Sequence, residues 1–175
     1  MVITFRKLED YDYEYEMLYN WCKSKDIYEW FEQRELSFDE IKTKYKNKLE
    51  AGKQEILIIR CDDKDIGLVQ IYKYDDDLDI KELKKYKNTY EYDIFIGDKE
   101  YTSKGIGSLV INLIDDIIYS KYKADSIILR PFKRNVRAVK CYQKCNYKII
   151  DEYEDFDTIG NKEIITVLLN NKNNP

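Results

Sequence analysis

The sequence predicts a single α/β (α+β) domain in which a mixed sheet is flanked by helices. The chain of 175 residues has the length of one domain with a sizeable core. Segments with strand-like alternation are interleaved with segments of helical periodicity along the whole chain. No repeat or low-complexity linker divides it, and the prolines are Pro131 and Pro175 only, so we expect one domain over residues 1–175.

The first third of the chain predicts a strand and two helices. Val2–Lys7 alternates apolar and polar side chains, as a half-buried strand does. Helical patterns follow over Asp10–Trp21 and Phe38–Leu49. Ser37 is a suitable N-cap for the second helix, because Glu40 stands three residues further on and completes a capping box.

The middle of the chain predicts three consecutive strands. Glu55–Cys61 and Ile66–Tyr74 are joined by Asp62–Asp65, a polar turn that favours a hairpin. Tyr90–Gly97 is the third strand.

A helix that begins at Ile106 has the clearest pattern in the sequence. Its apolar positions recur with a spacing of three and four residues, which places them on one face of a helix. They are Leu109, Val110, Leu113, Ile114, Ile117 and Ile118.

The remaining elements complete the order β-α-α-β-β-β-α-β-α-β-β. Ser126–Leu129 is a short buried strand that ends before Pro131. Asn135–Cys145 is helical, with Val136, Val139 and Tyr142 on one side. The last two strands, joined by a turn around Gly160 and Asn161, are Tyr147–Tyr153 and Lys162–Leu169.

The chain contains no histidine, which excludes several catalytic arrangements. Serine and cysteine nucleophile systems that use an imidazole base are impossible here. Four cysteines without a CxxC pair predict reduced, mostly buried thiols and no metal site. Proton transfer must therefore use carboxylates, Tyr, Cys, Lys or water.

Neither the charge nor the hydropathy of the chain predicts a nucleic-acid or membrane protein. The 34 acidic and 30 basic residues give a net charge of −4, which disfavours a phosphate-backbone binder. The chain start has no signal-peptide pattern and no apolar run is long enough to span a bilayer, so we expect a cytoplasmic protein. Two acidic segments, Asp75–Asp79 and Asp151–Asp157, predict solvated loops or, alternatively, rims that attract a polycationic substrate.

The segment Tyr101–Ser108 lies between the predicted strand Tyr90–Gly97 and the amphipathic helix that begins at Ile106. Gly105 and Gly107 allow the backbone to approach a ligand closely, and the helix start has N–H groups without intrahelical partners. These donors and the helix dipole suit a pyrophosphate, and Lys104 adds a positive charge. The pattern is neither a Walker A loop nor a Rossmann fingerprint, and by itself it is equally compatible with a structural turn.

Two motifs in the right order resemble those of the GNAT acetyltransferases. Lys104-Gly105-Ile106-Gly107 resembles the end of the pyrophosphate motif Q/R-x-x-G-x-G/A, and Asn135–Tyr147 resembles N-x-x-A-x-x-x-Y-x-K-x-G-F. Ile27–Phe31, Asp65–Tyr72 and Tyr92–Gly97 are similar to segments of the aminoglycoside 6′-N-acetyltransferases. The resemblance covers nearly the whole chain and implies a mostly antiparallel sheet with splayed central strands.

The resemblance also implies acetyl-CoA as co-substrate and assigns its binding residues. Amides around the glycine loop would hold the pyrophosphate, an exposed strand edge would pair with the pantetheine arm, and Asn135 would hydrogen-bond that arm. The implied coenzyme-binding residues are Ile94, Phe95, Ile96, Thr102, Ser103, Lys104, Gly105, Ile106, Gly107, Ser108, Asn135, Arg137, Ala138 and Tyr142.

The same resemblance implies the roles of the acceptor-side and catalytic residues. Asp93 would orient the acceptor amine and take its proton, directly or through water, while Tyr142 would protonate the departing thiolate. Asp93 interrupts an apolar strand, where we expect it to be buried and therefore costly without a function. The implied substrate-binding residues are Trp30, Phe31, Tyr72, Asp93 and Arg130.

Three positions depart from the family pattern. Thr102 stands where the motif has Gln or Arg. Asn146 replaces a glycine that follows the helix Asn135–Cys145, a place where Asn can also adopt the left-handed conformation. Arg130 precedes Pro131 where the aminoglycoside enzymes have Asp-Pro. This change reverses the charge beside a cationic substrate.

The expected function is acetyl transfer to a primary amine of a cationic small molecule, with an aminoglycoside first. A polyamine, or a protein or peptide amine, is the alternative acceptor. A non-catalytic acetyl-CoA-binding domain is a further alternative, and it would not need Asp93 and Tyr142. We expect a monomer or a homodimer, without metal.

Overall fold

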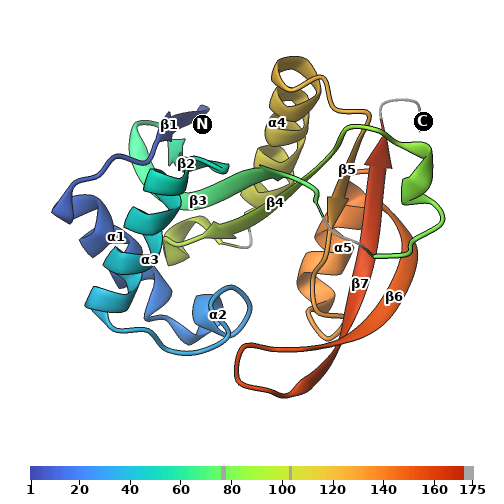
Figure 1. The fold of residues 1–175 in the computed structure, drawn as a ribbon. Coiled ribbons are helices and arrows are strands. Elements are labelled where there is room, and N and C mark those ends of the chain that lie inside the picture. Colours follow the sequence, from blue (N-terminus) through green and yellow to red (C-terminus); the bar gives the residue numbers. More distant parts are fainter. Residues whose placement is uncertain (76–77, 103, 172–175) are drawn as a thin grey trace. The chain divides into compact units, whose positions relative to one another are not determined.

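The computed structural model describes residues 1–75, 78–102 and 104–171 (Figure 1). The chain forms two compact units, and neither is continuous in sequence. The first comprises Met1–Tyr72 with Asp93–Thr102, and the second comprises Lys73–Tyr92 with Ser103–Pro175.

The first unit contains three strands, three helices and the end of a fourth strand. In chain order these are β1 (Ile3–Lys7), α1 (Asp12–Cys22), α2 (Lys25–Tyr28), α3 (Phe38–Ala51), β2 (Gln54–Cys61), β3 (Lys64–Lys73), the end of β4 (Thr89–Ile96) and the 3₁₀ turn η2 (Lys99–Tyr101).

Local sequence signals explain two boundaries in this unit. Ser37 and Glu40 form the expected capping box at the start of α3, with each side chain accepting from the other residue's backbone N–H. Asp62 and Asp63 both have positive φ, 46° and 68°, and form a two-residue turn between β2 and β3. A turn with two left-handed residues matches the twist of a hairpin, which the sequence predicted here.

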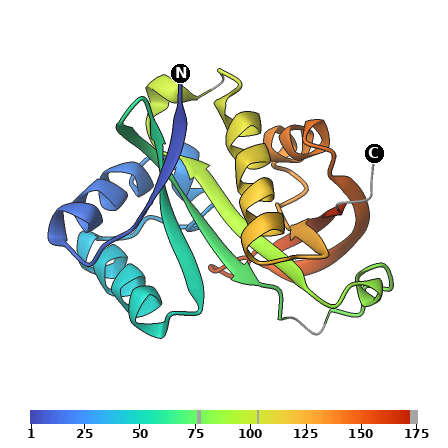
Figure 2. The ribbon, with the colours of Figure 1, turned by 90° about the horizontal axis from the view of Figure 1, so that it is seen from above.

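Helices α1 and α3 lie on one side of strands β1 to β3 (Figure 2). Their apolar faces bury a core that includes Tyr15, Leu18 and Tyr45. Gly67 on β3 is required by close packing, because a Cβ there would lie 2.3 Å from the Phe95 carbonyl oxygen of β4.

The second unit contains the start of β4, the helices α4 and α5, and the strands that follow them. After the 3₁₀ turn η1 (Leu83–Lys85) these are α4 (Ile106–Lys121), β5 (Ser126–Leu129), α5 (Val136–Lys144), β6 (Lys148–Phe156) and β7 (Lys162–Asn171). The segment before β4 packs Ile80 and Leu83 against Ile128, Val167 and Leu169.

The sheet has the strand order β1-β2-β3-β4-β5-β7-β6. The registered pairs β1–β2, β2–β3, β5–β7 and β6–β7 are antiparallel, whereas β4 and β5 are parallel. The parallel pairing covers only Thr89–Glu91 opposite Ser126–Ile128. The sheet is therefore mixed and mostly antiparallel, as the resemblance predicted.

The structure confirms all eleven predicted helices and strands and adds the short helix α2 and the two 3₁₀ turns. Asn146 has the expected left-handed conformation, with φ 66°. Of the first acidic segment, Asp76 and Asp77 lie outside the described residues. The second acidic segment forms most of β6. There Glu152 pairs with Lys133 and Glu154 pairs with Lys162, so the lysines partly neutralise the negative charge of this segment.

Candidate functional site

The start of α4 offers backbone donors to a ligand. Gly105 is its N-cap, with φ 78° and ψ −5°, and it has no side chain that could accept from the first amides. In contrast, the Ser37 side chain caps α3 and the Asn135 side chain caps α5. Lys104 and Gly105 are exposed, and Ser103, also predicted to bind coenzyme, lies outside the described residues. The geometry is that of an anion-binding helix start.

The first turn of α4 lies against α5. A Cβ at Gly107 would be 3.7 Å from the Cys141 Sγ, and the Ser108 Oγ is 3.4 Å from the same sulfur. Hydrogen bonding from Cys145, which outweighs burial, lowers the pKa of Cys141 to about 6, with help from Ser108 and the charges of Lys144 and Arg137. Ile106 is buried and anchors this turn.

Helix α5 carries the other residues predicted to bind coenzyme. The Asn135 Oδ1 accepts from the Ala138 backbone N–H at 3.2 Å, so this side chain already has a structural use. Arg137 is exposed and Ala138 is half-buried. The half-buried ring of Tyr142 lies with its centroid 6.1 Å from that of Tyr147.

A buried carboxyl group lies behind this tyrosine pair in the second unit. The Asp115 Oδ1 accepts from the hydroxyls of Tyr147 (2.7 Å) and Tyr92 (3.1 Å), and its Oδ2 accepts from the Asn170 amide (3.2 Å). Burial raises the pKa of Asp115 to about 7, although these hydrogen bonds act in the opposite direction. The sequence had given this aspartate no role.

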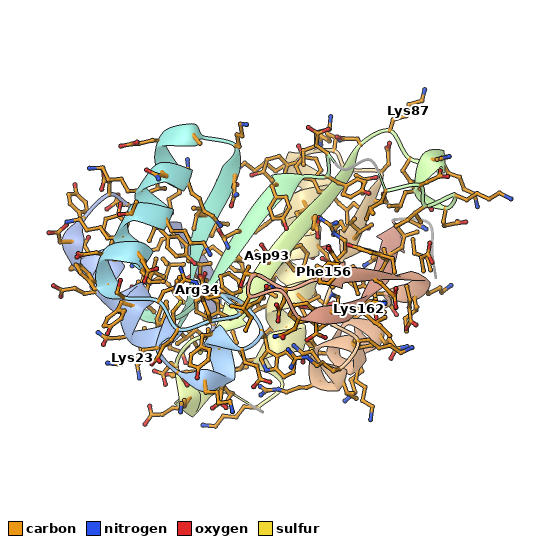
Figure 3. All side chains as sticks on the ribbon, turned by 60° about the horizontal axis from the view of Figure 1, so that its bottom comes forward. Lys23, Arg34, Lys87, Asp93, Phe156 and Lys162 are labelled. Atoms are coloured by element: carbon orange, nitrogen blue, oxygen red, sulfur yellow. The ribbon has the colours of Figure 1, made fainter. Side chains whose placement is uncertain are left out.

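In the first unit, Asp93 lies on β4 and is exposed (Figure 3). The expectation that it is buried was wrong: Glu91 and Phe95 lie on the same face of the strand and are buried, but the position between them is exposed. The Tyr72 hydroxyl donates to the Asp93 Oδ2 at 3.3 Å. The structure thus brings together two residues that the resemblance assigned to the acceptor.

Aromatic rings surround the end of β4. The Phe31 and Phe95 rings meet edge to face with centroids 4.7 Å apart, and the Trp21 ring contacts Phe95 from another direction at 6.1 Å. Trp30, in the turn that follows α2, is half-buried. The flanking residues of β4, Ile94 and Ile96, are half-buried as well.

Thr102, at the end of the first unit, uses its hydroxyl locally. The Oγ1 donates to the Lys99 carbonyl oxygen at 2.9 Å and so closes η2. This contact fixes the chain just before the glycine segment, but it does not test the predicted contact with the coenzyme.

A polar cluster in the first unit was missed by the sequence analysis. The Lys48 Nζ of α3 donates to the Gln70 Oε1 of β3 at 2.5 Å, and Gln70 is fully buried. One turn earlier on α3, Lys44 pairs with the buried Glu32. Burial and the nearby charge of Lys44 lower the pKa of Lys48 to about 8, while the carboxylates of Asp93 and Glu32 act in the opposite direction. No motif marked these positions.

Arg130 belongs to an ion pair inside the second unit. Its Nε and Nη2 donate to both carboxylate oxygens of the buried Glu91, at 2.8 and 2.9 Å. Its guanidinium also donates to the Tyr153 hydroxyl at 3.3 Å and lies 5.6 Å from the centroid of the Tyr74 ring. Burial opposes the charge, but the hydrogen bonds and charge of Glu91 raise the pKa of Arg130. The sequence analysis had treated Arg130 as an unpaired cation and had overlooked Glu91.

Within each unit, the arrangement suits one kind of ligand. The first unit combines an exposed carboxylate, a tyrosine hydroxyl and aromatic rings, which suit an organic ammonium ion. The second offers the uncapped helix start to an anion. Over residues 1–75, 78–102 and 104–171, no group of three or more Cys, Asp or Glu side chains could hold a metal ion. None of the helices in these ranges has the length and apolar character needed to cross a membrane.

Comparison with known proteins assigns a family to this sequence. The profile of the acetyltransferase (GNAT) domain family matches residues 10–155. Among curated proteins, the acetyltransferase PseH of Campylobacter jejuni is 24% identical over 144 residues, which cover 82% of each chain.

Solved structures with the same fold include two acetyltransferases bound to coenzyme A. One is the aminoglycoside acetyltransferase AAC(6')-Ib with coenzyme A and kanamycin (TM-score 0.76, 16% identity, 98% of this chain and 95% of that chain). The other is the spermidine N-acetyltransferase of Vibrio cholerae with CoA and spermine (TM-score 0.77, 19% identity, 98% and 96%).

Proposed function

The chain belongs to the acetyltransferase (GNAT) domain family, and from this premise we propose that it transfers the acetyl group of acetyl-CoA to a primary amine of a cationic small molecule. An aminoglycoside 6′-amine is the first candidate acceptor. A polyamine is the second. The protein would act in the cytoplasm, where its four free cysteines remain reduced, as a monomer or a homodimer.

The uncapped start of α4 is the observation that carries this proposal. A helix of 16 residues begins at a left-handed glycine, which has no side chain that could accept from the first amides. The glycine at position 107 adds no Cβ to the same turn, and Lys104 adds a positive charge. These features fit a pyrophosphate, which the coenzyme of this family carries.

Bound acetyl-CoA supplies an acetyl thioester to the reaction. Lys104, Gly105 and the residues of the first α4 turn would hold its pyrophosphate. The β4 segment Ile94–Ile96 would pair with the pantetheine arm, and Asn135, Arg137 and Ala138 would contact the coenzyme from the start of α5.

Asp93 would hold the acceptor amine in the first unit. Its carboxylate is exposed and is oriented by the Tyr72 hydroxyl, so it can accept hydrogen bonds from an ammonium ion. Trp30 and Phe31 would cover the apolar part of the acceptor. A backbone N–H of the β4 segment around Phe95 would polarise the thioester carbonyl.

Tyr142 would donate a proton to the departing thiolate. Most of the rate enhancement would come from positioning, which supplies ~7–11 kcal/mol, whereas acid–base assistance typically contributes ~10²–10⁴-fold. The residues of the acceptor half are therefore expected to affect both acceptor affinity and turnover.

The ion pair of Arg130 bears on the choice of acceptor. Because Glu91 accepts hydrogen bonds from both Nε and Nη2 of Arg130, Arg130 repels a cationic acceptor less than an unpaired arginine would. This favours keeping aminoglycosides among the candidates although the family's Asp-Pro is replaced. The similarity to AAC(6')-Ib and to the Vibrio cholerae spermidine enzyme supports a cationic acceptor at the level of fold only.

The decisive experiment is a free-thiol release assay with acetyl-CoA and three classes of acceptor. The panel contains kanamycin-type aminoglycosides, their 6′-hydroxyl analogues, spermidine and short peptides. Thiol release with 6′-amines but not with 6′-hydroxyl analogues supports the aminoglycoside. Activity on spermidine or peptides alone would replace the aminoglycoside as the proposed acceptor and would still support acetyl transfer. Binding of the coenzyme without transfer to any amine would overturn the enzyme proposal and favour an acetyl-CoA-binding domain.

A further inference from the structure

Lys48 is a half-buried titratable group of the first unit that the proposed reaction has not used. It lies on α3, is half-buried, and forms its hydrogen bond with a neutral amide, that of Gln70. Its Nζ also lies 5.6 Å from the centroid of the buried Tyr45 ring. A lysine in such surroundings has lost much of its hydration and loses its proton more readily than an exposed one.

The register of β3 and β4 places this group beside Asp93. The Gly97 N–H donates to the Ile66 carbonyl oxygen at 2.7 Å, which fixes the antiparallel alignment. Counting four residues along each strand from this pair brings Gln70 opposite Asp93. Side chains directly opposite one another lie on the same face with Cβ atoms ~4.5–5.5 Å apart. The amide that holds Lys48 is thus the cross-strand neighbour of the carboxylate proposed to hold the amine.

Four other titratable groups face Lys48 from the elements packed around it. Lys44 on α3 repels its charge, while Asp93 on β4 and Glu32 before α3 attract it. Tyr45 on α3 stays protonated, because burial raises its pKa well above the ordinary value. Lys44 is itself paired with Glu32, so the charge of Lys48 is poorly compensated by comparison.

We propose that the Lys48 Nζ accepts the proton of the acceptor ammonium held at Asp93. This inference rests on the proposed acetyl transfer and divides between two residues the work that the sequence analysis gave to Asp93 alone. An amine is a far stronger base than a carboxylate, since ordinary side-chain pKa values are about 10.4 for Lys and 3.9 for Asp. Gln70 can accept an N–H from Lys48 whether the amine is neutral or charged, so it holds the base in place in both states.

The proton and electron pairs balance as follows. The acceptor ammonium gives one proton to neutral Lys48, and the freed amine uses its lone pair to form the bond to the acetyl carbon. The carbon–sulfur bond then breaks, and its electron pair leaves on the thiolate. The thiolate takes a second proton from the amine nitrogen by way of Tyr142 or water. Lys48 finally returns its proton to solvent.

The test compares pH profiles of kcat/KM in wild type, Lys48→Arg and Lys46→Arg. Arginine keeps the positive charge but cannot act as a base near neutral pH. Lys46 is an exposed residue of the same helix and is the matched control. The measurement uses two acceptors whose amines have different pKa values. A limb of the pH profile that comes from an enzyme group stays at the same pH with both acceptors, whereas one that comes from the acceptor amine moves.

The wild type and the Lys46→Arg variant should show a limb near pH 8 that does not move with the acceptor. In Lys48→Arg this limb should vanish and the plateau should fall by at least about 10²-fold. A limb that persists in Lys48→Arg overturns the inference while leaving the acetyl transfer intact. Absence of thiol release in the wild type would instead remove the proposed function on which it rests.

A second measurement needs neither turnover nor a stable variant. Reductive ¹³C-methylation of the lysines of the wild-type protein allows each one to be titrated by NMR. One lysine resonance, distinct from that of the methylated N-terminal amine, should titrate near pH 8, and it should move when an acceptor amine is added. If all lysine resonances titrate above pH 10, Lys48 cannot be the base.

Discussion

Glu91 and Arg130 form a bidentate ion pair at the point where the parallel strands β4 and β5 stop pairing. Glu91 is the last registered residue of β4, opposite Ile128, and Arg130 follows the end of β5 directly. The pair links the two strands at this point inside the second unit. It gives Arg130 a structural role, and the predicted contact of Arg130 with substrate stays a prediction.

Replacement of Arg130 by Met should destabilise the protein by about 3–5 kcal/mol, because it leaves the carboxylate of Glu91 buried without its partner. Urea unfolding at pH 7 measures this loss. The double variant Glu91→Gln with Arg130→Met should recover most of the stability. Equal loss in the single and double variants would show that the guanidinium has another essential partner.

Asp115 should make stability fall as the pH rises. Burial raises its pKa in the folded state to about 7 from the ordinary 3.8, so the folded state binds this proton more tightly than the unfolded state does. Its contribution is complete below about pH 4 and is lost as the pH passes through about 7. We expect Asp115→Asn to gain about 1–3 kcal/mol relative to wild type between pH 5 and pH 8 in urea unfolding.

The neighbouring Asp116→Asn is the matched control, because Asp116 is exposed on the same helix. The Asp116 charge is the smallest of the named causes of the raised Asp115 pKa, so the pH dependence of this variant should stay close to that of the wild type. A pH dependence that is the same in Asp115→Asn and Asp116→Asn would contradict the assignment.

Gly105→Asp should weaken coenzyme binding without unfolding the protein. Its φ of 78° suits Asn and Asp better than other side chains, and no atom lies within 4 Å of a Cβ built there. The new carboxylate would cap the first α4 amides and repel a pyrophosphate. Isothermal titration with CoA should show a loss of at least about tenfold relative to Gly105→Asn, which has the same shape without the charge. Equal affinities would place the pyrophosphate elsewhere.

Asp93→Asn should impair both acceptor affinity and turnover. A hydrogen bond to a charged group contributes about 1.5–3 kcal/mol, so we expect kcat/KM for the acceptor to fall by roughly ten- to hundredfold or more. The affinity for CoA should not change. Steady-state kinetics with unchanged acceptor constants would remove Asp93 from the site.

Tyr142→Phe should lower turnover without abolishing it. Loss of the hydroxyl removes one proton donor, and the thiolate can still take its proton from water, so a decrease of roughly 10²-fold is expected. The Tyr142 ring contacts Tyr147, and Phe preserves that contact. Single-turnover measurements isolate the chemical step, and a wild-type rate there would exclude Tyr142 from the chemistry.

The helices and strands could be predicted from the sequence because their signals are local, whereas the mostly antiparallel sheet was expected from the family resemblance. The stripe of α4, the capping box at Ser37 and the left-handed Asn146 each depend on residues a few positions apart. Helix α2 was missed because its four residues are too few to show a helical period.

The electrostatics of the site could not be predicted, because they depend on partners distant in sequence. Glu91 and Arg130 are 39 positions apart, and Lys48 and Gln70 are 22 apart. Only the register of the strands and the packing of α3 bring such groups together. The exposure of Asp93 was also mispredicted, since burial changes from one residue to the next along the same face, where Glu91 and Phe95 are buried.

The interleaving of the two units limits how the protein can be divided. Tyr72 is the last residue before the chain passes into the second unit, and Asp93 is the first residue on its return. A gene fragment that ended between them would encode Trp30, Phe31 and Lys48 but not the carboxylate to which Tyr72 donates. Under the proposed function, an exchange of amine recognition between relatives must therefore extend through Asp93–Thr102, and a contiguous exchange carries the intervening part of the second unit with it.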